Sequence, residues 1–304
     1  MKGHQPLPSI TAMSLGNIDG VSPKLQDKLE KVLLGAMEQI DWNQIELPPL
    51  SPMADQLVGI CGSTQLSLEH IEILIEAEPA FAAKVMTRAN SLTEFPPAVT
   101  LKQAIRRLKK VAIVQLIAEV ASNNFGQRFP EIVRHLMRKL WTHLIFSAHA
   151  ARELARWTNK VDPEEAFVSA MFSNIAVPVV ICAITRHTHG DLAMLNYASP
   201  ITQFINNQQR GLSRHILESW QFAGRVVGFP ERLAVSEGDN MAAIVGLANE
   251  SAMAYGYTYG GLQPQPKKLK QYLHKLNLEQ SAVNTLSEVI GPSLNAALSI
   301  VRTI

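Results

Sequence analysis

The residues best suited to chemistry in this sequence are a few histidines, because a neutral imidazole can bind a metal or move a proton near neutral pH. His143 lies in an apolar helical stretch beside Leu140 and Leu144, while His187 and His189 form a close pair. No cysteine or carboxylate cluster of recognised metal-binding spacing completes either position. We therefore expect His143 to be a structural histidine rather than a ligand-pocket residue. The pair is expected to interact with the C-terminal dipole of a helix rather than with a metal.

Ser173 and Asn174 are a second unusual feature, because they interrupt a stretch from Ala166 to Thr185 that contains no charged side chain. A buried amide without a hydrogen-bond partner costs about 1–3 kcal/mol, so this polar pair must be satisfied. The simpler interpretation is hydrogen bonding within the core, where buried polar groups usually find partners. The alternative is that the pair lines a pocket that still binds a ligand.

A run of cations forms the third candidate site. Its members could meet phosphates or an acidic partner, and they are Lys102, Arg106, Arg107, Lys109 and Lys110. No aromatic residues interleave with these charges, as a platform for single-stranded nucleic acid requires. A solvated helix face is the simpler interpretation, and binding of phosphate or of an acidic partner is the alternative.

Familiar catalytic templates are absent from the sequence. It has no G-x-S-x-G nucleophile elbow, no G-x-x-x-x-G-K-[ST] phosphate loop and no G-x-G-x-x-G dinucleotide turn. The serines, histidines and aspartates show no spacing that singles out a nucleophile and its base. We accordingly assign no catalytic residue, no metal and no cofactor.

The composition is that of a globular protein with little net charge. Hydrophobic residues make up 47% of the 304 residues, enough for a sizeable core, and the net charge is +2. So small a charge predicts neither a DNA nor a membrane partner. Cys61 and Cys182 lie far apart and form no C-x-x-C, which favours buried thiols in a reducing cytoplasm. The first twenty residues lack the continuous apolar segment of a secretory signal.

Helices must position these candidate residues. The run Asp162-Pro163-Glu164-Glu165 can cap and start a helix, so we predict one central core helix through 166–185 rather than a membrane span. A long helix from about Pro130 to Trp157 would carry His143, and Thr100-x-x-Gln103 forms a capping box that opens the helix with the cations. No β-alternation appears, and further helices are predicted at 25–36, 53–61, 67–78, 80–89, 111–120, 200–209, 213–224, 240–255, 267–277 and 278–304.

The predicted organisation is a single all-α domain over residues 22–304, preceded by a loosely tethered arm at 1–21. The apolar stripe from Leu25 to Ala36 could seal this domain internally or form a homodimer contact. The proline strip, Leu47-Pro48-Pro49-Leu50-Ser51-Pro52, favours an extended boundary or clasp because its prolines exclude helix interior. Residues 256–266 form a connection, and 267–304 form C-terminal helices with a kink at Gly291-Pro292.

Several of these segments, in order, resemble the HDOD, or HD-related output, domain. The resemblance is strongest over residues 40–255 and implies an N-terminal helical group packed on a group related to the metal-dependent HD phosphohydrolases. The segments that carry it are Leu47–Pro52, Ser67–Ile75, Glu78–Ala80, Lys84–Ser91, Val99–Ile105, Leu140–His143, Asp162–Phe167, Phe172–Ile175, Val227–Pro230 and Val245–Asn249.

The resemblance also implies the loss of a metal site. HD phosphohydrolases carry a His-Asp pair where this chain has Ser173-Asn174, and neither side chain offers the ligand strength or charge that a catalytic divalent metal needs. His143 occupies the place of the first histidine, and Asn249 lies near that of the last aspartate. His143, Ser173, Asn174 and Asn249 are therefore the candidates for a vestigial pocket. Lys109 stands where these domains often have glycine.

What the resemblance implies for function is a non-catalytic signalling protein of a bacterial cytoplasm that binds another protein and could bind a small ligand. Its mechanism would be a docking movement of the N-terminal helices against the helices around 172–178, with the proline strip as hinge or clasp. One alternative is a divergent phosphohydrolase of nucleotides or cyclic dinucleotides that uses His143, His187 and His189. Another is a nucleotide-binding regulator without catalysis.

Overall fold

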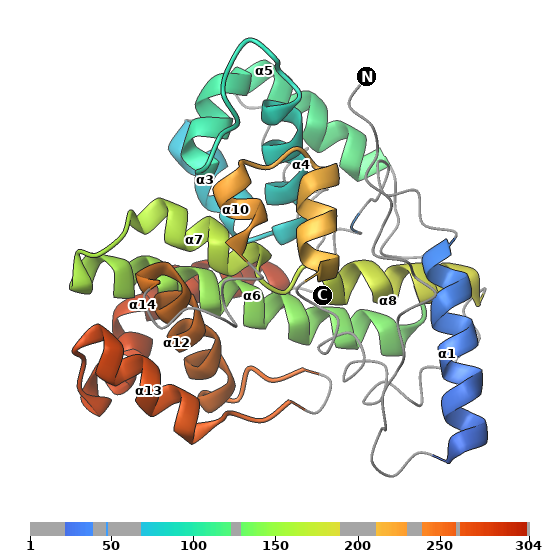
Figure 1. Cartoon of the computed structure of the whole chain (residues 1–304). Helices are drawn as coiled ribbons and strands as arrows, with labels where there is room; N and C mark the ends of the chain where they lie inside the picture. Colours follow the sequence, from blue (N-terminus) through green and yellow to red (C-terminus); the bar gives the residue numbers. More distant parts are fainter. Residues whose placement is uncertain are drawn as a thin grey trace.

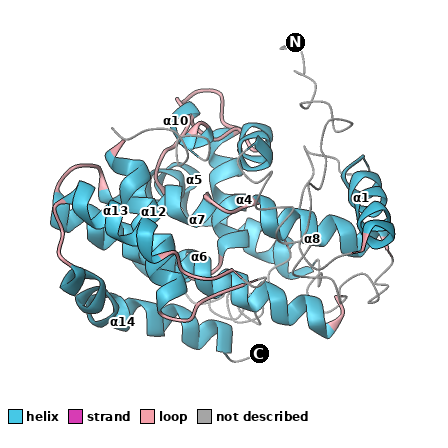
Figure 2. Ribbon diagram, turned by 60° about the horizontal axis from the view of Figure 1, so that its bottom comes forward, coloured by secondary structure: helices cyan, strands magenta, loops and turns pink. Residues whose placement is uncertain are grey.

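The computed structural model describes residues 22–38, 47, 68–122, 129–188, 211–229, 239–259 and 262–302. All regular secondary structure in these residues is helical, which confirms the all-α prediction (Figure 1; Figure 2). The arm at 1–21, Pro48–Pro52 of the proline strip and the helices predicted at 53–61 and 200–209 lie outside the described residues. A short helix at 211–219 accompanies α1 (Pro23–Glu38), α3 (Leu68–Glu76), α4 (Pro79–Asn90), α5 (Leu101–Ser122), α6 (Glu131–Thr158), α7 (Pro163–Phe172), α8 (Ala176–His187), α10 (Gly224–Val227), α12 (Asn240–Ala254), α13 (Pro266–Leu276) and α14 (Gln280–Arg302).

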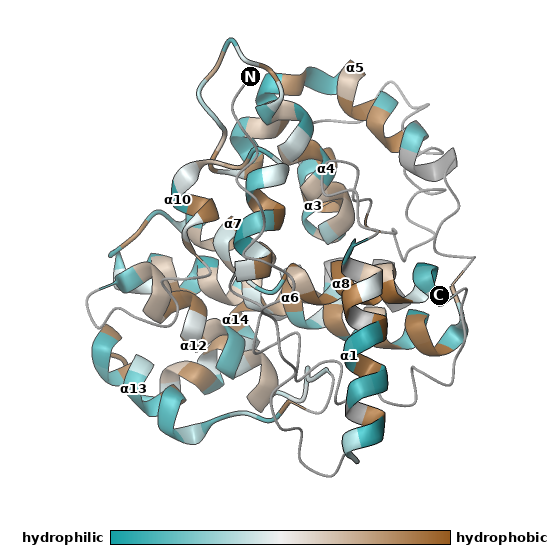
Figure 3. Ribbon diagram, turned by 45° about the vertical axis from the view of Figure 1, so that its right-hand side comes forward, coloured by the Kyte–Doolittle hydropathy of each residue, from teal (hydrophilic) through white to brown (hydrophobic). Residues whose placement is uncertain are grey.

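Helix α6 is the central packing element, in contact with α4, α7, α8, α12 and α14. It is 28 residues long and runs through the middle of the molecule, with α7, α12 and α14 against it (Figure 1). A single cluster of buried apolar side chains extends from Leu29 in α1 to Leu294 in α14. Hydrophilic residues gather on α1 and α13 at the periphery (Figure 3). Residues on the inner faces of α6 are therefore buried on every side.

The predicted central core helix is wrong in one respect, because the chain turns at 173–175 and separates α7 from α8. A helix continued through this turn would bring the ring of Pro178 against the carbonyl of Asn174 and would lose one hydrogen bond. The predicted cap is confirmed: Asp162 Oδ1 accepts hydrogen bonds of 2.9 Å from the backbone N–H of Glu164 and of Glu165. The stretch Pro163–His187 is long and apolar enough to cross a membrane, yet 94% of its most apolar window is buried inside the protein.

Helix α5 is kinked at Lys109, where φ is 60° and ψ is 166°. This conformation belongs almost entirely to glycine, because the Cβ of other residues collides with the backbone, at a cost of about 1–3 kcal/mol. The kink divides α5 into two parts, which correspond to the separate helices predicted from the sequence before and after it. One half of the predicted capping box is present at the start of α5, where Gln103 N donates to Thr100 Oγ1 at 3.2 Å. In place of the other half, Gln103 Oε1 accepts from Val99 N at 3.0 Å, one residue before the N–H that a capping box uses.

Helix α1 packs on α8. Leu29 and Ala36 are buried, and a Cβ added to Gly35 would lie 3.2 Å from His187 Nε2. These two residues of the apolar stripe thus lie inside the protein, while a homodimer contact through α1 stays a prediction. At the other end of the chain, α13 packs on α12, and α14 packs on α6.

Candidate functional site

His143 is the centre of the candidate site and is only 1% exposed on α6. Its Nδ1 lies 2.8 Å from the carbonyl oxygen of Tyr257. A carbonyl oxygen can only accept a hydrogen bond, so Nδ1 must donate, and in the neutral ring the lone pair is then on Nε2. Burial lowers the pKa of His143 to about 4, although the nearby Tyr257 carbonyl and Asn249 amide act in the opposite direction. The imidazole is therefore neutral at pH 7.

Ser173 and Asn249 lie beside His143. Asn249 Nδ2 donates to Ser173 Oγ at 3.4 Å, and Ser173 Oγ donates to the carbonyl of Ala170 at 2.9 Å. His143 Nε2 and Asn249 Oδ1 are both acceptors and neither has a hydrogen bond, whereas the amide in its flipped orientation would donate to Nε2. The structure thus brings together three of the four vestigial-pocket residues predicted from the sequence.

Asn174, the fourth of these residues, is buried in the turn next to Ser173. Its carbonyl accepts a hydrogen bond of 3.1 Å from Val177 N at the start of α8. The backbone N–H of Ala176 donates to Ser213 Oγ at 3.3 Å. Backbone and hydroxyl groups therefore anchor the turn that carries Ser173.

A segment that we call the tyrosine strap, Tyr255–Tyr259, covers His143. Tyr259 packs edge-on against the imidazole at 4.9 Å between ring centroids, and Tyr255 and Tyr257 lie against Phe146 at 5.5 and 5.1 Å. Tyr255 also donates from its hydroxyl to Val283 O at 2.6 Å. The strap had no place in the sequence predictions, which treated residues 256–266 as a connection. Three tyrosines within five residues were the available signal, because aromatic side chains bury large areas when they pack on a core.

The groups gathered here do not suit a catalytic divalent metal. They are one neutral imidazole, one hydroxyl and one amide, whereas hard cations are held by anionic carboxylates together with other oxygen or imidazole ligands. Tyr259 supplies no anion either, because burial raises the pKa of its phenol well above the usual value. The arrangement can hold a neutral polar group but offers no means of activating a metal-bound water.

His187 lies away from this site. It is in the last turn of α8, against Gly35 of α1. The turn at Ser173 is at the other end of α8, roughly 16 Å away along the helix axis. The structure therefore does not bring His187 to His143 as the phosphohydrolase alternative required. His189 lies outside the described residues.

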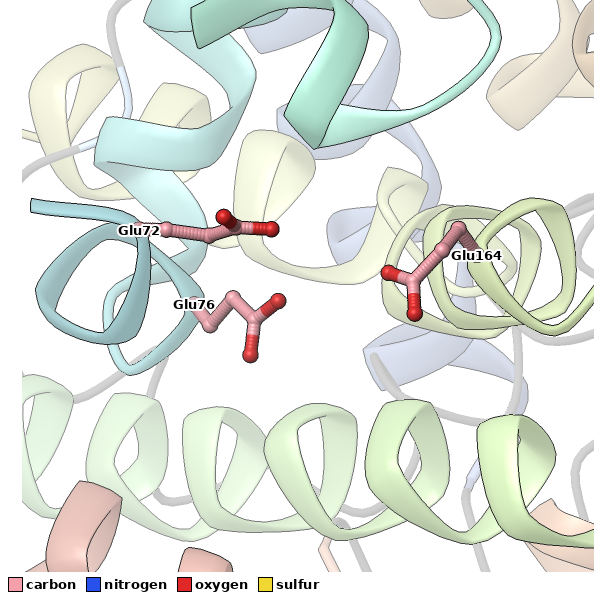
Figure 4. Close-up of side chains that lie close together, drawn as sticks. All are labelled: Glu72, Glu76 and Glu164. Atoms are coloured by element: carbon pink, nitrogen blue, oxygen red, sulfur yellow. The ribbon is translucent and has the colours of Figure 1, made fainter. Parts of the chain in front are cut away.

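An acidic cluster between α3 and α7 was not predicted from the sequence. The carboxylates of Glu72, Glu76 and Glu164 point toward one another above α6 (Figure 4), with ligand atoms within 4.8 Å of each other. Arg152 of α6 pairs bidentately with Glu76 and with Glu164 at 2.7 Å, and its guanidinium stacks 3.9 Å over the ring of Phe167.

The charge state of this cluster follows from the same contacts. Burial alone would lower the pKa of Arg152, but Glu76 and Glu164 outweigh that effect and raise it. Burial, followed by the charges of Glu76 and Glu164, raises the pKa of Glu72. The cluster is thus an ion-pair network that holds α3 and α7 on α6, with the arginine already occupying the place that a cation would need.

The predicted cations all lie on the first half of α5. Lys102, Arg106 and Lys109 are exposed, while Arg107 and Lys110 are half-buried. Arg107 lies 5.2 Å over the ring of Phe95. Helices α3, α4 and α5 pack on one another, and we call them the α3–α5 group. The surface with the cations belongs to this group and is separate from the His143 site.

Comparisons with known proteins agree with this architecture. The MmoQ response regulator from Methylococcus capsulatus str. Bath superposes with a TM-score of 0.62 at 15% identity, over 80% of this chain and 98% of that chain. A virulence factor from Campylobacter jejuni subsp. jejuni gives 0.52 at 16% identity, over 90% and 95%. A chain from Shewanella amazonensis SB2B that is named for metal-dependent phosphohydrolase activity gives 0.49 at 19% identity, over 88% and 99%. At identities below 25%, the first two likenesses show the fold alone.

The sequence comparison is more specific. No curated protein matches the chain. A family model, the HDOD domain, matches residues 47–229, from the proline strip to just before α12. The resemblance at Val245–Asn249 lies outside that range. Since the match covers more than half of the sequence and the helices have the expected arrangement, the chain belongs to the HDOD domain family.

Proposed function

We propose that this protein is a non-catalytic signalling module of the bacterial cytoplasm that acts by binding another protein. The observation that carries the proposal is the state of His143: its imidazole is neutral, sealed by the tyrosine strap, and accompanied by Ser173 and Asn249 instead of carboxylates. Such a site lacks both the charge and the open coordination position that metal-assisted hydrolysis requires. The similar MmoQ structure is by name a response regulator.

The regulatory step would be a change in how the α3–α5 group sits on α6 and α7. Arg152 joins α6 to Glu76 and Glu164, and Trp141 of α6 donates a 2.8 Å hydrogen bond to Glu78 between α3 and α4. These contacts make the boundary between the groups polar and specific, so a partner that bound one group would act on the other through them. A small ligand at His143 would first have to displace Tyr259.

The test is hydrolysis of phosphodiester bonds in nucleotides and cyclic dinucleotides, with manganese, magnesium, iron or zinc supplied. We expect no turnover above that of the His143→Ala variant. Metal-stimulated hydrolysis that His143→Ala abolishes would overturn the proposal, provided that His135→Ala retains it. His135 is the matched control because it is an exposed histidine on the same helix.

A further inference from the structure

The cations on α5 are a local concentration of positive charge in a protein whose net charge is small. Lys102, Arg106, Arg107, Lys109 and Lys110, which we call the α5 basic face, bring five positive charges into nine residues, whereas the whole chain has a net charge of +2. No described residue forms a salt bridge with any of them.

Some cations elsewhere on the surface do have such partners. Lys31 pairs with Asp27 at 2.8 Å, and Arg214 pairs with Glu218 at 2.9 Å. Arg156 and Arg225 likewise bond to glutamates. The α5 basic face differs from them in lying open to anions from outside, apart from Lys102, whose charge acts on Glu72.

The backbone at the middle of this surface is strained. Lys109 occupies a conformation that glycine adopts without penalty, and strain of this kind collects at sites that have a function. The kink directs the chain so that Val111, two residues later, is 72% exposed. A more stable helix with glycine at the kink would lack this lysine charge.

Apolar side chains accompany the cations. Phe95 is 50% exposed under the guanidinium of Arg107, and Val111 is the most exposed large hydrophobic residue of the described chain. Exposed apolar groups beside charges are typical of surfaces that bind proteins, where a buried anchor supplies affinity and charges supply orientation and association rate. A free phosphate or a nucleic-acid backbone would make no use of Val111.

We propose that the α5 basic face is a docking surface for an acidic segment of a partner protein that carries apolar side chains among its carboxylates. The carboxylates would pair with Arg106, Lys109 and Lys110, and an apolar side chain would cover Val111. This inference rests on the proposed function, because it identifies the surface through which the signalling module would meet its partner.

The probe for this surface is a fluorescein-labelled amphipathic peptide built from glutamate and leucine, followed by anisotropy at physiological ionic strength. We expect Arg106→Glu/Lys110→Glu to weaken its binding by about tenfold or more, because like charges then face each other. Lys267→Glu/Lys270→Glu on α13 makes the same change of charge at exposed lysines away from α5, and should change affinity by less than about twofold. Val111→Ser should weaken binding of this peptide and leave binding of polyglutamate unchanged.

Each contrary result has a definite meaning. No saturable binding of the peptide, or equal losses in the two double variants, would overturn the proposal, because only net charge would then matter. Single-stranded RNA of equal charge binding more tightly than the peptide, with sensitivity to Arg106→Glu/Lys110→Glu, would assign the face to nucleic acid instead. None of these results involves hydrolysis. The docking proposal can therefore be rejected by the binding experiment without rejecting the proposed non-catalytic function, which the hydrolysis assay tests.

Discussion

Trp141 Nε1 donates a 2.8 Å hydrogen bond to Glu78 Oε1, and both residues are fully buried, with 0% of their surface exposed. Glu78 also caps α4, accepting from Ala80 N at 3.4 Å. One buried carboxylate therefore caps α4 and joins the connection between α3 and α4 to the central helix. A buried carboxylate that lost this donor would have to remain partly unsatisfied or take up a proton.

The first prediction concerns this pair. Trp141→Phe keeps an aromatic ring but removes the donor, so the free energy of unfolding should fall by about 2–4 kcal/mol. Urea denaturation followed by far-UV circular dichroism measures the change. Trp157→Phe is the control, since Trp157 is a partly exposed tryptophan at the end of the same helix, and it should shift stability by less than about 0.5 kcal/mol. Equal effects of the two substitutions would show that the Glu78 bond contributes nothing.

The second prediction concerns the kink in α5. Lys109→Gly should raise the free energy of unfolding by about 1 kcal/mol, because relief of the strained conformation outweighs the larger chain entropy of glycine. Lys110→Gly, at the next position, should lower stability by about 1 kcal/mol, as glycine does in a helix interior. Thermal or urea unfolding measures both variants. The two changes in the free energy of unfolding should have opposite signs if Lys109 has the φ and ψ described, and the same sign if it does not.

The third prediction is the pH dependence of stability. Burial lowers the pKa of His143 to about 4 and that of His149 to about 3, so the unfolded chain takes up protons at these residues before the folded chain does. Stability should therefore decrease as the pH falls below about 6.5, and each histidine should account for roughly 2 kcal/mol between pH 7 and pH 5.

Variants separate these contributions. Urea unfolding at pH 7 and pH 5 gives the decrease in the free energy of unfolding for each variant. For His143→Gln this decrease should be smaller than for the parent protein by roughly 2 kcal/mol. His135→Gln should follow the parent, because His135 is exposed. If His143→Gln kept the full pH dependence, the imidazole would not be held neutral by burial.

The fourth prediction concerns the approach of α13 to α12. A Cβ at position 246 would lie 2.7 Å from Tyr272 Cε2 and closer still to Cζ, so Gly246→Ala should destabilise the protein by about 1–3 kcal/mol. A Cβ at Gly291 in α14 meets nothing within 4 Å, and Gly291→Ala should change stability by less than about 1 kcal/mol, because the helix propensity of alanine is offset by the clash of its Cβ with the following Pro292. Thermal unfolding that showed a gain for Gly246→Ala would mean that the two helices do not pack closely there.

Much of this structure could be predicted from local sequence signals. Asp162 and Thr100 cap helices where their spacing to Glu165 and Gln103 indicated, and Asn277 ends α13 in the left-handed conformation. Helix periodicity and capping are properties of neighbouring residues, which is why they can be read without the fold. Pro178 was also a local signal, and its incompatibility with a continuous helix should have placed a turn at residues 173–175.

The parts that sequence spacing did not predict join distant residues. Arg152 meets Glu76 and Glu164 from three separate helices, and no spacing in the chain relates them. The tyrosine strap reaches His143 across more than a hundred residues. That His143, Ser173 and Asn249 belong together was inferred from family resemblance, since their separation in sequence carries no such information.

The proposed non-catalytic function requires that the site around His143 holds no catalytic metal. Its most direct test is the metal content of untagged protein purified without chelator, measured by plasma mass spectrometry. We expect less than about a tenth of an ion per chain, because a single neutral imidazole with a hydroxyl and an amide binds such metals too weakly to keep them. Near-stoichiometric manganese, iron or zinc that His143→Ala removes would contradict it.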